Sequence, residues 1–242
     1  MEKIIVYVKP IDWTEGDEYG MAFRMSEYNS QIKINWGDGK SDTYFGKEIR
    51  AQHIYPKDTT LSFIVEAEIT GGEIEYFSPS GGDCYHEYVD FSGAPSIKEI
   101  YCESFKKVKL DNCLLTKLTL KIMLGKDYDL TKVPNLKELV FDCENREIKC
   151  LDLSYCHKLE DLQCWCYITP KLKLILPNDA PLKYIDISGH DFSKGCLDAI
   201  HRIIERNGGE IVGEFEEPIE DDDTIFDIIL NTHEKNKKKQ DD

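Results

Sequence analysis

Apolar and polar residues alternate along several short stretches of the first 80 residues. Residues 4–8, 21–25, 32–36 and 73–76 follow this alternation, and residues 61–69 show it most fully. In residues 61–69 the side chains on one face are Leu61, Phe63, Val65, Ala67 and Ile69. A period of two predicts β-strands with one buried face. Because glycine and aspartate separate the stretches, we expect a small β-sandwich.

A hairpin is expected at residues 34–39, which read INWGDG. Asp38 and Gly39 tolerate the positive φ that tight hairpin turns require. Trp36 ends its strand on the apolar side, so we predict that it is a buried core residue. Tyr55 is predicted at the start of the next strand, where its ring packs inward and its hydroxyl holds a loop in place.

The order of these residues resembles the PKD-type β-sandwich repeat over roughly residues 28–70. That family combines a tryptophan and a Gly-Asp-Gly turn with a later His-x-Tyr strand start, as INWGDG and HIYPKDTTLSFIVEAEI do here. Thr59 and Leu61 stand where the family usually has a glycine and an aromatic residue. The resemblance implies a spacer or adhesion module without chemistry. Asp38 and His53 could alternatively bind a metal, but a metal site needs three or four converging ligands, so we interpret the turn as structural.

After residues 78–83, which read SPSGGD, the apolar residues recur as pairs, and from Leu139 onward successive pairs are 11 or 12 residues apart. Sorted alternately, the pairs form two series in which most steps are 21–23 residues. The first residues of the pairs in the two series are Ile100, Leu118, Leu139, Leu162 and Ile185, and Val108, Leu130, Leu151 and Leu174. A fixed period in this range is typical of solenoids, whose coils bury their apolar ridges against neighbouring coils.

The local phrases of this region repeat as well: PSIKEIYC, PNLKELVFDC, HKLEDLQC and PLKYIDIS. With IKCLDLSYC at residues 148–156, they resemble leucine-rich repeats over about 100 residues. The likeness is to irregular bacterial repeats that have a short strand on both sides of the coil. The array departs from regularity between Leu120 and Leu136, where KIMLGKDYDLTKVP predicts a distorted coil.

An amphipathic helix is expected from Ser193 to about Arg206. Ser193 can cap its start, and the Asn-Gly-Gly sequence at residues 207–209 can end it. This helix would close the open end of the solenoid, and a short strand near residues 211–212 is expected to follow it.

The expected fold class is mainly β with a few helices. A PKD- or Ig-like β-sandwich over residues 1–78 is joined to a short leucine-rich repeat solenoid with a C-terminal capping helix over residues 84–213. Residues 214–242 are expected to form an acidic linker, a short helix and a disordered tail. The linker is residues 214–223, where seven of ten residues are carboxylates, and the helix runs from about residue 223 to residue 234.

The chain is acidic, with 30 Lys and Arg residues against 46 Asp and Glu residues and a net charge of −16. This charge repels the phosphates of nucleic acids and anionic lipids, so we expect neither nucleic acid nor a membrane as a partner. A basic protein is the expected partner. The sequence does not indicate an oligomeric state.

The sequence contains no apolar stretch of about 20 residues, as a transmembrane helix requires, and no signal peptide. The nine cysteines are an odd number, which argues against a complete disulfide framework. Free thiols are typical of a reducing cytoplasm. We therefore expect a cytoplasmic location, or a surface location if a leader has been removed.

Five cysteines lie at or just after predicted strands of the repeat: Cys102, Cys113, Cys143, Cys156 and Cys164. The repeat needs a small buried side chain at these positions, so we predict that they pack in the core. Cys164 with Cys166, or Cys156 with His157, could alternatively bind zinc or supply a nucleophile. No Cys-x-x-Cys pair occurs, and the spacings follow the repeat, so we expect no metal and no cofactor.

If Leu139 and Phe141 point inward, their neighbours along each strand point outward. The outward residues that we predict to bind a partner, called here the predicted stripe, are Tyr101, Glu138, Asp142, Asp161, Gln163, Trp165, Tyr184 and Asp186. Acids around exposed aromatic residues suit a basic protein surface, because the aromatics supply anchoring area and the charges steer approach. The alternative is an ordinary solvated face of a sheet.

The expected function is that of a non-catalytic protein–protein interaction module. The sequence has no G-x-S-x-G, P-loop, H-E-x-x-H or dinucleotide-binding motif. A bacterial immunity or antitoxin protein that neutralises a toxin is a specific version of this hypothesis. A cell-surface adhesion protein is an alternative, because both resembled families often occur outside cells. A hydrolase is another, using the acids of residues 214–223 or Cys156 with His157, although neighbours in a strand face opposite ways.

Overall fold

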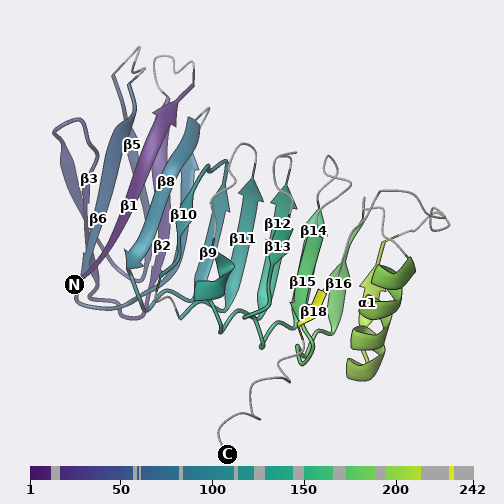
Figure 1. The fold of residues 1–242 in the computed structure, drawn as a ribbon. Helices are drawn as coiled ribbons and strands as arrows, with labels where there is room; N and C mark the ends of the chain where they lie inside the picture. Colours follow the sequence, from purple (N-terminus) through teal and green to yellow (C-terminus); the bar gives the residue numbers. More distant parts are fainter. Residues whose placement is uncertain are drawn as a thin grey trace, which may run out of the picture.

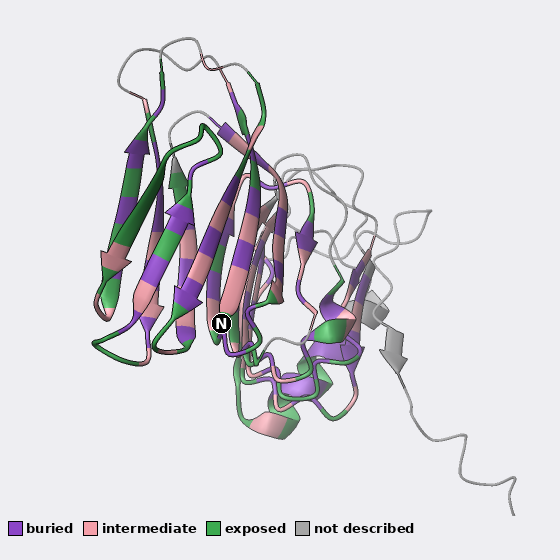
Figure 2. Cartoon of the chain, turned by 90° about the vertical axis from the view of Figure 1, so that its left-hand side faces the viewer, coloured by how far each residue is buried: buried purple, intermediate pink, exposed green. Residues whose placement is uncertain are grey.

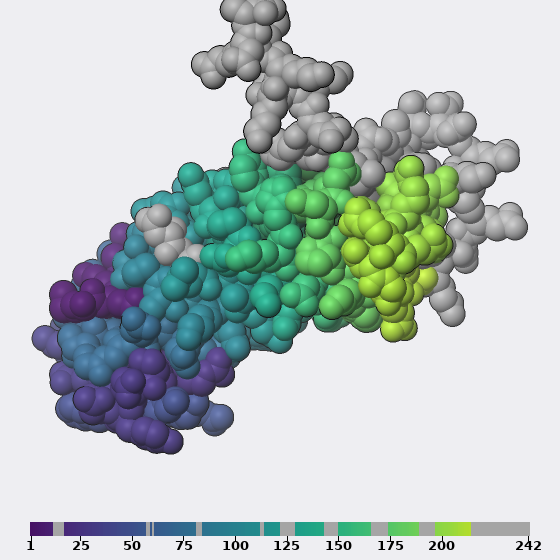
Figure 3. Space-filling model, turned by 90° about the horizontal axis from the view of Figure 1, so that it is seen from below, coloured from purple at the N-terminus to yellow at the C-terminus, as the bar shows by residue number. Residues whose placement is uncertain are grey.

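The computed structural model describes residues 1–11, 17–56, 59, 61–81, 84–111, 114–122, 129–143, 150–165, 173–188, 194–213 and 229–231. Over these residues the chain is mainly β, with one α-helix, α1 (Lys194–Asn207), and one short 3-10 helix, η1 (Leu130–Lys132). The strands follow one another along an elongated body that runs from the N-terminal strands to α1 (Figures 1 and 3). The expected mainly β class and the helix near the C-terminus are confirmed.

The N-terminal strands form two facing sheets. The six-stranded sheet has the order β10-β8-β1-β6-β3-β4. Its strands are β1 (Glu2–Pro10), β3 (Gln31–Asn35), β4 (Ser41–Phe45), β6 (Phe63–Thr70), β8 (Cys84–Gly93) and β10 (Val108–Lys109). The facing strands are β2 (Glu18–Met25), β5 (Glu48–Ile54) and β7 (Ile74–Gly81). Large side chains fill the space between the sheets, among them Tyr19, Phe23, Trp36, Phe77 and Phe91.

Burial alternates along the sandwich strands, as the period of two predicts (Figure 2). In β6, Val65 and Ala67 are buried, whereas Ile64 lies on the outer face. Leu61 was expected on the inward face, but it is 81% exposed. The reason is that β6 begins at Phe63, so Leu61 precedes the strand and is not held by its pleat.

The second sheet does not end at the sandwich. Strand β7 pairs in parallel with β9 (Glu99–Glu103), placing Tyr76 beside Glu99 and Phe77 beside Ile100. From β9 the sheet continues through parallel strands to form nine strands in the order β17-β16-β14-β12-β11-β9-β7-β2-β5. The added strands are β11 (Lys117–Ile122), β12 (Glu138–Cys143), β14 (Asp161–Trp165), β16 (Tyr184–Asp186) and β17 (Glu210–Val212). We call β9 and these five strands the ladder.

This continuity bears on the predicted division near residues 78–84. Strand β7 runs to Gly81, and β8, which begins at Cys84, pairs with β1 inside the sandwich. The strands on both sides of residues 82–83 therefore belong to the sandwich.

The first predicted aliphatic series is confirmed as one row of the nine-stranded sheet. Its members occupy matching positions in neighbouring strands and are all buried: Ile100, Leu118, Leu139, Leu162 and Ile185. Burying one aliphatic row against the next supplies the core of this part of the molecule.

The second series forms a sheet only in part. Leu151 and Leu174 lie opposite each other in β13 (Cys150–Asp152) and β15 (Lys173–Pro177). Val108 pairs instead with Val89 of the sandwich, and Leu130 lies in η1. The 3-10 helix falls within the region where we expected a distorted coil.

The helix that we expected over about residues 223–234 is wrong at residues 229–231. These residues form β18 (Ile229–Asn231), which pairs in parallel with β15 at the edge of the three-stranded sheet β13-β15-β18. Isoleucine favours strands, and the edge of β15 offers backbone hydrogen bonds that a helix would leave unused. The acidic run at residues 214–223, the rest of the predicted helix and the tail lie outside the described residues.

The end of α1 is confirmed where the Asn-Gly-Gly sequence predicted it. Gly208 has φ 67° and its N–H donates to the Glu205 carbonyl at 3.1 Å, while the Gly209 N–H donates to the Ile204 carbonyl at 3.0 Å. These two bonds form the Schellman motif, which turns the chain directly into β17. Ser193, the expected cap of the helix start, lies outside the described residues.

Candidate protein-binding face

The INWGDG segment forms the loop between β3 and β4, as expected. These strands pair down to Asn35 and Ser41, and the Trp36 N–H donates to the Lys40 carbonyl at 3.1 Å. The positive φ angles belong to Gly37 (82°) and Gly39 (88°), so our expectation of positive φ at Asp38 is wrong. Gly37 is required for a second reason, because a Cβ there would lie 2.5 Å from the Ile64 carbonyl oxygen.

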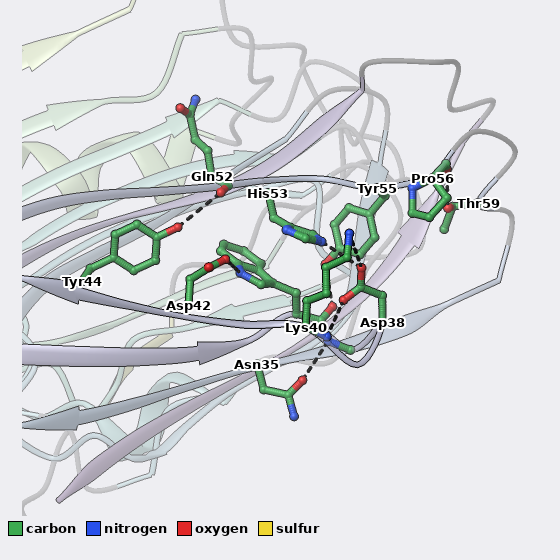
Figure 4. Close-up of polar contacts among 12 residues, drawn as sticks. Asn35, Asp38, Lys40, Asp42, Tyr44, Gln52, His53, Tyr55, Pro56 and Thr59 are labelled. Atoms are coloured by element: carbon green, nitrogen blue, oxygen red, sulfur yellow. Dashed lines mark hydrogen bonds and ion pairs between the residues drawn. The ribbon is translucent and has the colours of Figure 1, made fainter.

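A cluster of side chains fixes this loop (Figure 4). Trp36 is fully buried, and its Nε1 donates to Asp42 Oδ2 at 2.7 Å. The His53 ring stacks on Trp36 at 5.1 Å between ring centroids, and its Nε2 lies 2.9 Å from Asp38 Oδ2. The Tyr55 hydroxyl donates to the Trp36 carbonyl at 2.6 Å. The predicted burial of Trp36 and the predicted role of the Tyr55 hydroxyl are confirmed.

His53 and Tyr55 do not begin a strand, which corrects our prediction. His53 lies near the end of β5, and Tyr55 follows that strand. The strand starts earlier because Ile49, Ala51 and His53 already alternate inward along it. Burial acts to raise the pKa of Asp38, but its hydrogen bonds, the one to His53 foremost, outweigh burial and lower that pKa. Asp38 and His53 thus work as a hydrogen-bonded pair within the loop.

Among the described residues, no group of three or more His, Cys, Asp or Glu side chains is arranged to hold a metal ion. The cysteine prediction is confirmed for Cys102, Cys156 and Cys164, which are buried. Burial raises the pKa of the Cys102 and Cys156 thiols to about 12, so both stay protonated at neutral pH. Cys113 and the side chain of Cys143 lie outside what the structure describes.

Cys156 and His157 do not form a nucleophile and base. Cys156 is fully buried, whereas His157 is exposed and its Nδ1 lies 2.6 Å from Asp179 Oδ1. A general base must lie within hydrogen-bond distance of the proton that it removes. The buried Cys156 thiol and the exposed His157 imidazole do not meet this condition.

All eight residues of the predicted stripe lie on the outward face of the nine-stranded sheet. They occupy the partly exposed positions that alternate with the buried aliphatic row. Three of them, Glu138, Asp161 and Tyr184, stand directly beside one another in register. In the same way Gln163 stands beside Asp186. The position of the stripe on one face therefore agrees with the sequence pattern.

Trp165 lies across the face toward the next strand. Its Nε1 donates to Asp186 Oδ2 at 3.0 Å, so the half-buried indole reaches over to the neighbouring strand β16. The other oxygen of Asp186 accepts hydrogen bonds from the Ser188 N–H at 3.0 Å and the Ser188 hydroxyl at 2.7 Å. Gln163 Nε2 donates to Asp161 Oδ1 at 3.3 Å. These bonds hold the polar surface in one arrangement.

Charges separate along the face. Toward the sandwich, acids are paired across strands: Glu99 with Arg24 at 2.9 Å and Glu103 with Lys121 at 3.8 Å. From β12 to β17 the outward positions carry five acids and no lysine or arginine; the acids are Glu138, Asp142, Asp161, Asp186 and Glu210. We call the outward residues of β12, β14, β16 and β17 the acidic half of the sheet.

Like charges meet inside this half. Asp161 stands directly opposite Glu138 in the neighbouring strand. Burial is the main cause that raises the pKa of Asp161, and the charge of Glu138 raises it further. Glu138 is itself in contact with Lys117 of β11, with 2.5 Å between Oε2 and Nζ. Directly opposed like charges destabilise a strand pair, and Lys117 offsets part of this repulsion because its charge also lowers the pKa of Asp161.

Sequence reasoning missed the residues that the sandwich contributes to this face. The Arg24 guanidinium lies 5.4 Å from the Tyr76 ring and pairs with Glu99 of the first ladder strand. Glu210 of β17, at the other end, was also not predicted. No local signal identifies these residues, because their membership depends on the pairing of β7 with β9 and of β16 with β17.

Comparison of the chain with protein-family models, curated proteins and solved structures gave no match. Within the described residues, no helix has the length and apolar character needed to cross a membrane. The resemblances to the PKD-type repeat and to leucine-rich repeats therefore stay predictions.

Proposed function

We propose that this chain is a non-catalytic protein-binding module that recognises a basic protein surface through the acidic half of its nine-stranded sheet. The observation that carries the proposal is the separation of charge along one continuous face, with five acids and no cation at the outward positions of β12, β14, β16 and β17. Acidic surfaces speed the approach of basic partners and disfavour acidic ones.

Aromatic residues within the acidic half supply the contact area that charge alone lacks. Trp165 and Tyr184 both lie on the outward face, and the bond from Trp165 to Asp186 holds the indole in place. Buried tryptophan and tyrosine contribute more binding energy than most interface residues. A side chain that is already ordered loses little conformational entropy on binding.

The row geometry favours a partner that presents several cations in a line. Glu138, Asp161, Tyr184 and Glu210 occupy one row across four neighbouring strands. Neighbouring strands lie about 4.8 Å apart, so lysine or arginine side chains at a similar spacing could contact successive acids. Neutralisation of a basic toxin by an immunity protein is one form that this function would take.

We further propose that β9 to β17 form a short leucine-rich-repeat-like solenoid and that β1 to β8 form a PKD-like sandwich. The parallel pairing of β9, β11, β12, β14, β16 and β17 supports the first part, as does the pairing of β13 with β15. The Trp36 loop with His53 and Tyr55 supports the second. Both resemblances would make the molecule a scaffold for recognition, which agrees with the proposed function.

The test is affinity purification with the wild-type chain and a charge-reversed double variant, Asp161→Lys with Glu210→Lys, which keeps the bond between Trp165 and Asp186. We expect the double variant to lose a basic partner that the wild-type chain captures, while its melting temperature stays within a few degrees of wild type. Glu48→Lys, on the exposed edge of β5, makes a similar charge reversal outside the acidic half and should retain the partner. Equal capture by wild type and the double variant would reject the site.

A further inference from the structure

Two buried polar atoms between the sandwich sheets have no hydrogen-bond partner among the residues that the structure describes. Among the described side chains these are Tyr19 Oη and His86 Nε2. Tyr19 lies on β2 of the nine-stranded sheet, and His86 lies on β8 of the six-stranded sheet. Their rings are neighbours, with centroids 5.8 Å apart and planes tilted by 54°. The two side chains therefore lie in one part of the core, next to β9, whose Glu103 contacts His86.

The backbone fixes the orientation of His86. Its Nδ1 lies 2.8 Å from the Glu103 carbonyl oxygen, which can only accept a hydrogen bond, so Nδ1 carries the hydrogen. The His86 N–H donates to the Ser104 carbonyl at 2.8 Å, and the Lys106 N–H donates to the His86 carbonyl at 2.9 Å. Ser104 has φ 53°, a strained conformation for a residue other than glycine. The strained turn thus presents two successive carbonyls to one histidine.

The chemical forms of the two groups complement each other. Burial lowers the pKa of His86, so the imidazole is neutral and Nε2 carries a bare lone pair. Burial also raises the pKa of Tyr19, so its phenol keeps its hydrogen. One group can donate and the other can accept, yet they do not bond to each other. Leaving either group without a hydrogen bond would cost the folded state the full free energy of removing that polar group from water.

We propose that one internal water molecule binds between Tyr19 Oη and His86 Nε2, accepting the phenol hydrogen and donating a hydrogen to the imidazole nitrogen. Water is the smallest molecule that both accepts and donates, and buried waters characteristically satisfy polar groups that lack protein partners. Cys84 and Cys102 are also buried in this core. A metal ion is the weaker candidate because the described residues contain no group of three suitable ligands. The bound water would link the two sheets of the sandwich.

The sign of a single stability change tests this proposal. Tyr19→Phe removes the hydroxyl and keeps the ring. If the water is bound, Tyr19→Phe removes one of its hydrogen-bond partners. The melting temperature should then fall, by about 2–4 °C for each kcal/mol of unfolding free energy that is lost. If the hydroxyl is unsatisfied, removing it should raise the melting temperature. Tyr7→Phe, on the partly exposed β1 position, is the matched control and should leave it unchanged.

A high-resolution crystal structure of the wild-type chain provides the second measurement. The expected result is electron density for one water within hydrogen-bond distance of both Tyr19 Oη and His86 Nε2. A direct bond between the two side chains, a metal ion, or an empty space would each overturn the proposal, as would a rise in the melting temperature of Tyr19→Phe.

Discussion

Individual side chains in the sandwich combine packing with directed hydrogen bonds. Trp36 fills the core, and three polar contacts fix its surroundings: Nε1 to Asp42, its carbonyl to Tyr55, and the stacked His53 to Asp38. His86 is held in a similar way by the carbonyls of Glu103 and Ser104. A buried group held so firmly cannot change its charge without cost.

We predict that acid destabilises the chain through His86. Its pKa is lowered in the folded state by burial, which outweighs the opposing hydrogen bonds to Glu103 and Ser104. In the unfolded chain His86 is protonated as pH falls through about 6.5, whereas in the folded chain it stays neutral to a lower pH. The contribution of His86 is therefore complete above about pH 6.5 and is lost as pH falls from there toward the lowered pKa of the folded state, with a slope of at most about 1.4 kcal/mol per pH unit.

The measurement is urea unfolding at several pH values between 8 and 5. His86→Phe should flatten the dependence of the unfolding free energy on pH below 6.5. His201→Gln replaces an exposed histidine on α1 and should keep the wild-type slope. A slope that is identical in wild type and His86→Phe would contradict this role for His86.

At the scale of elements, the end of α1 is determined by two glycines that act for different reasons. Gly208 needs a positive φ, but a side chain there would meet open space. Gly209 has no room, because a Cβ would lie 2.2 Å from the Lys183 carbonyl oxygen. The same Lys183 carbonyl accepts the Glu210 N–H at 2.7 Å, which is the first bond of β17 to its neighbour. The Lys183 carbonyl therefore limits the residue at the end of the helix and also begins the pairing of β17.

We predict that Gly209→Ala destabilises the chain more than Gly208→Ala does. The first substitution forces backbone atoms apart and should cost about 1–3 kcal/mol, as overpacking of a close contact does. Gly208→Ala only forces an alanine into the left-handed backbone conformation, which should cost about 1–2 kcal/mol at most. Thermal unfolding followed by far-ultraviolet circular dichroism measures both. A larger loss for Gly208→Ala would show that φ, and not the close approach to Lys183, limits this turn.

At the scale of the whole molecule, one sheet runs from the sandwich edge to β17 (Figure 1). The charges on its outward positions are unevenly distributed. Cross-strand pairs such as Arg24 with Glu99 balance the sandwich side. The acidic half concentrates like charges, including Glu138 opposite Asp161. A surface selected only for stability would distribute these charges differently, since opposed like charges cost free energy.

We predict that two acids of this half respond to neutralisation in opposite ways. Asp161→Asn removes a carboxylate whose pKa is raised by burial and by Glu138, so it should stabilise the free chain by about 0.2–1 kcal/mol at pH 7. Asp186→Asn weakens the acceptor of bonds from Trp165 and Ser188 and should destabilise it. Melting temperatures of the two variants compare them directly. If Asp161→Asn did not raise the melting temperature, the proposed repulsion between Asp161 and Glu138 would be contradicted.

Residue order alone was sufficient for five strands of the sandwich (β1, β2, β3, β6 and β7), the buried aliphatic row, the burial of Trp36 and the Gly-Gly end of α1. Each is a local consequence of which side of a strand or helix must be buried, or of a backbone angle that only certain residues adopt. The outward position of the predicted stripe followed from the same alternation. Strand β18 was missed because a short aliphatic run is compatible with both helix and strand.

The three-dimensional arrangement was needed for the pairing of β7 with β9, the contact of Arg24 with Glu99, the meeting of Tyr19 with His86, and the uneven charge of the continuous face. Alternation specifies which face of a strand is buried, but it does not specify the neighbouring strand. That choice depends on backbone hydrogen bonds and buried surface summed over residues far apart in the chain, which no local pattern encodes.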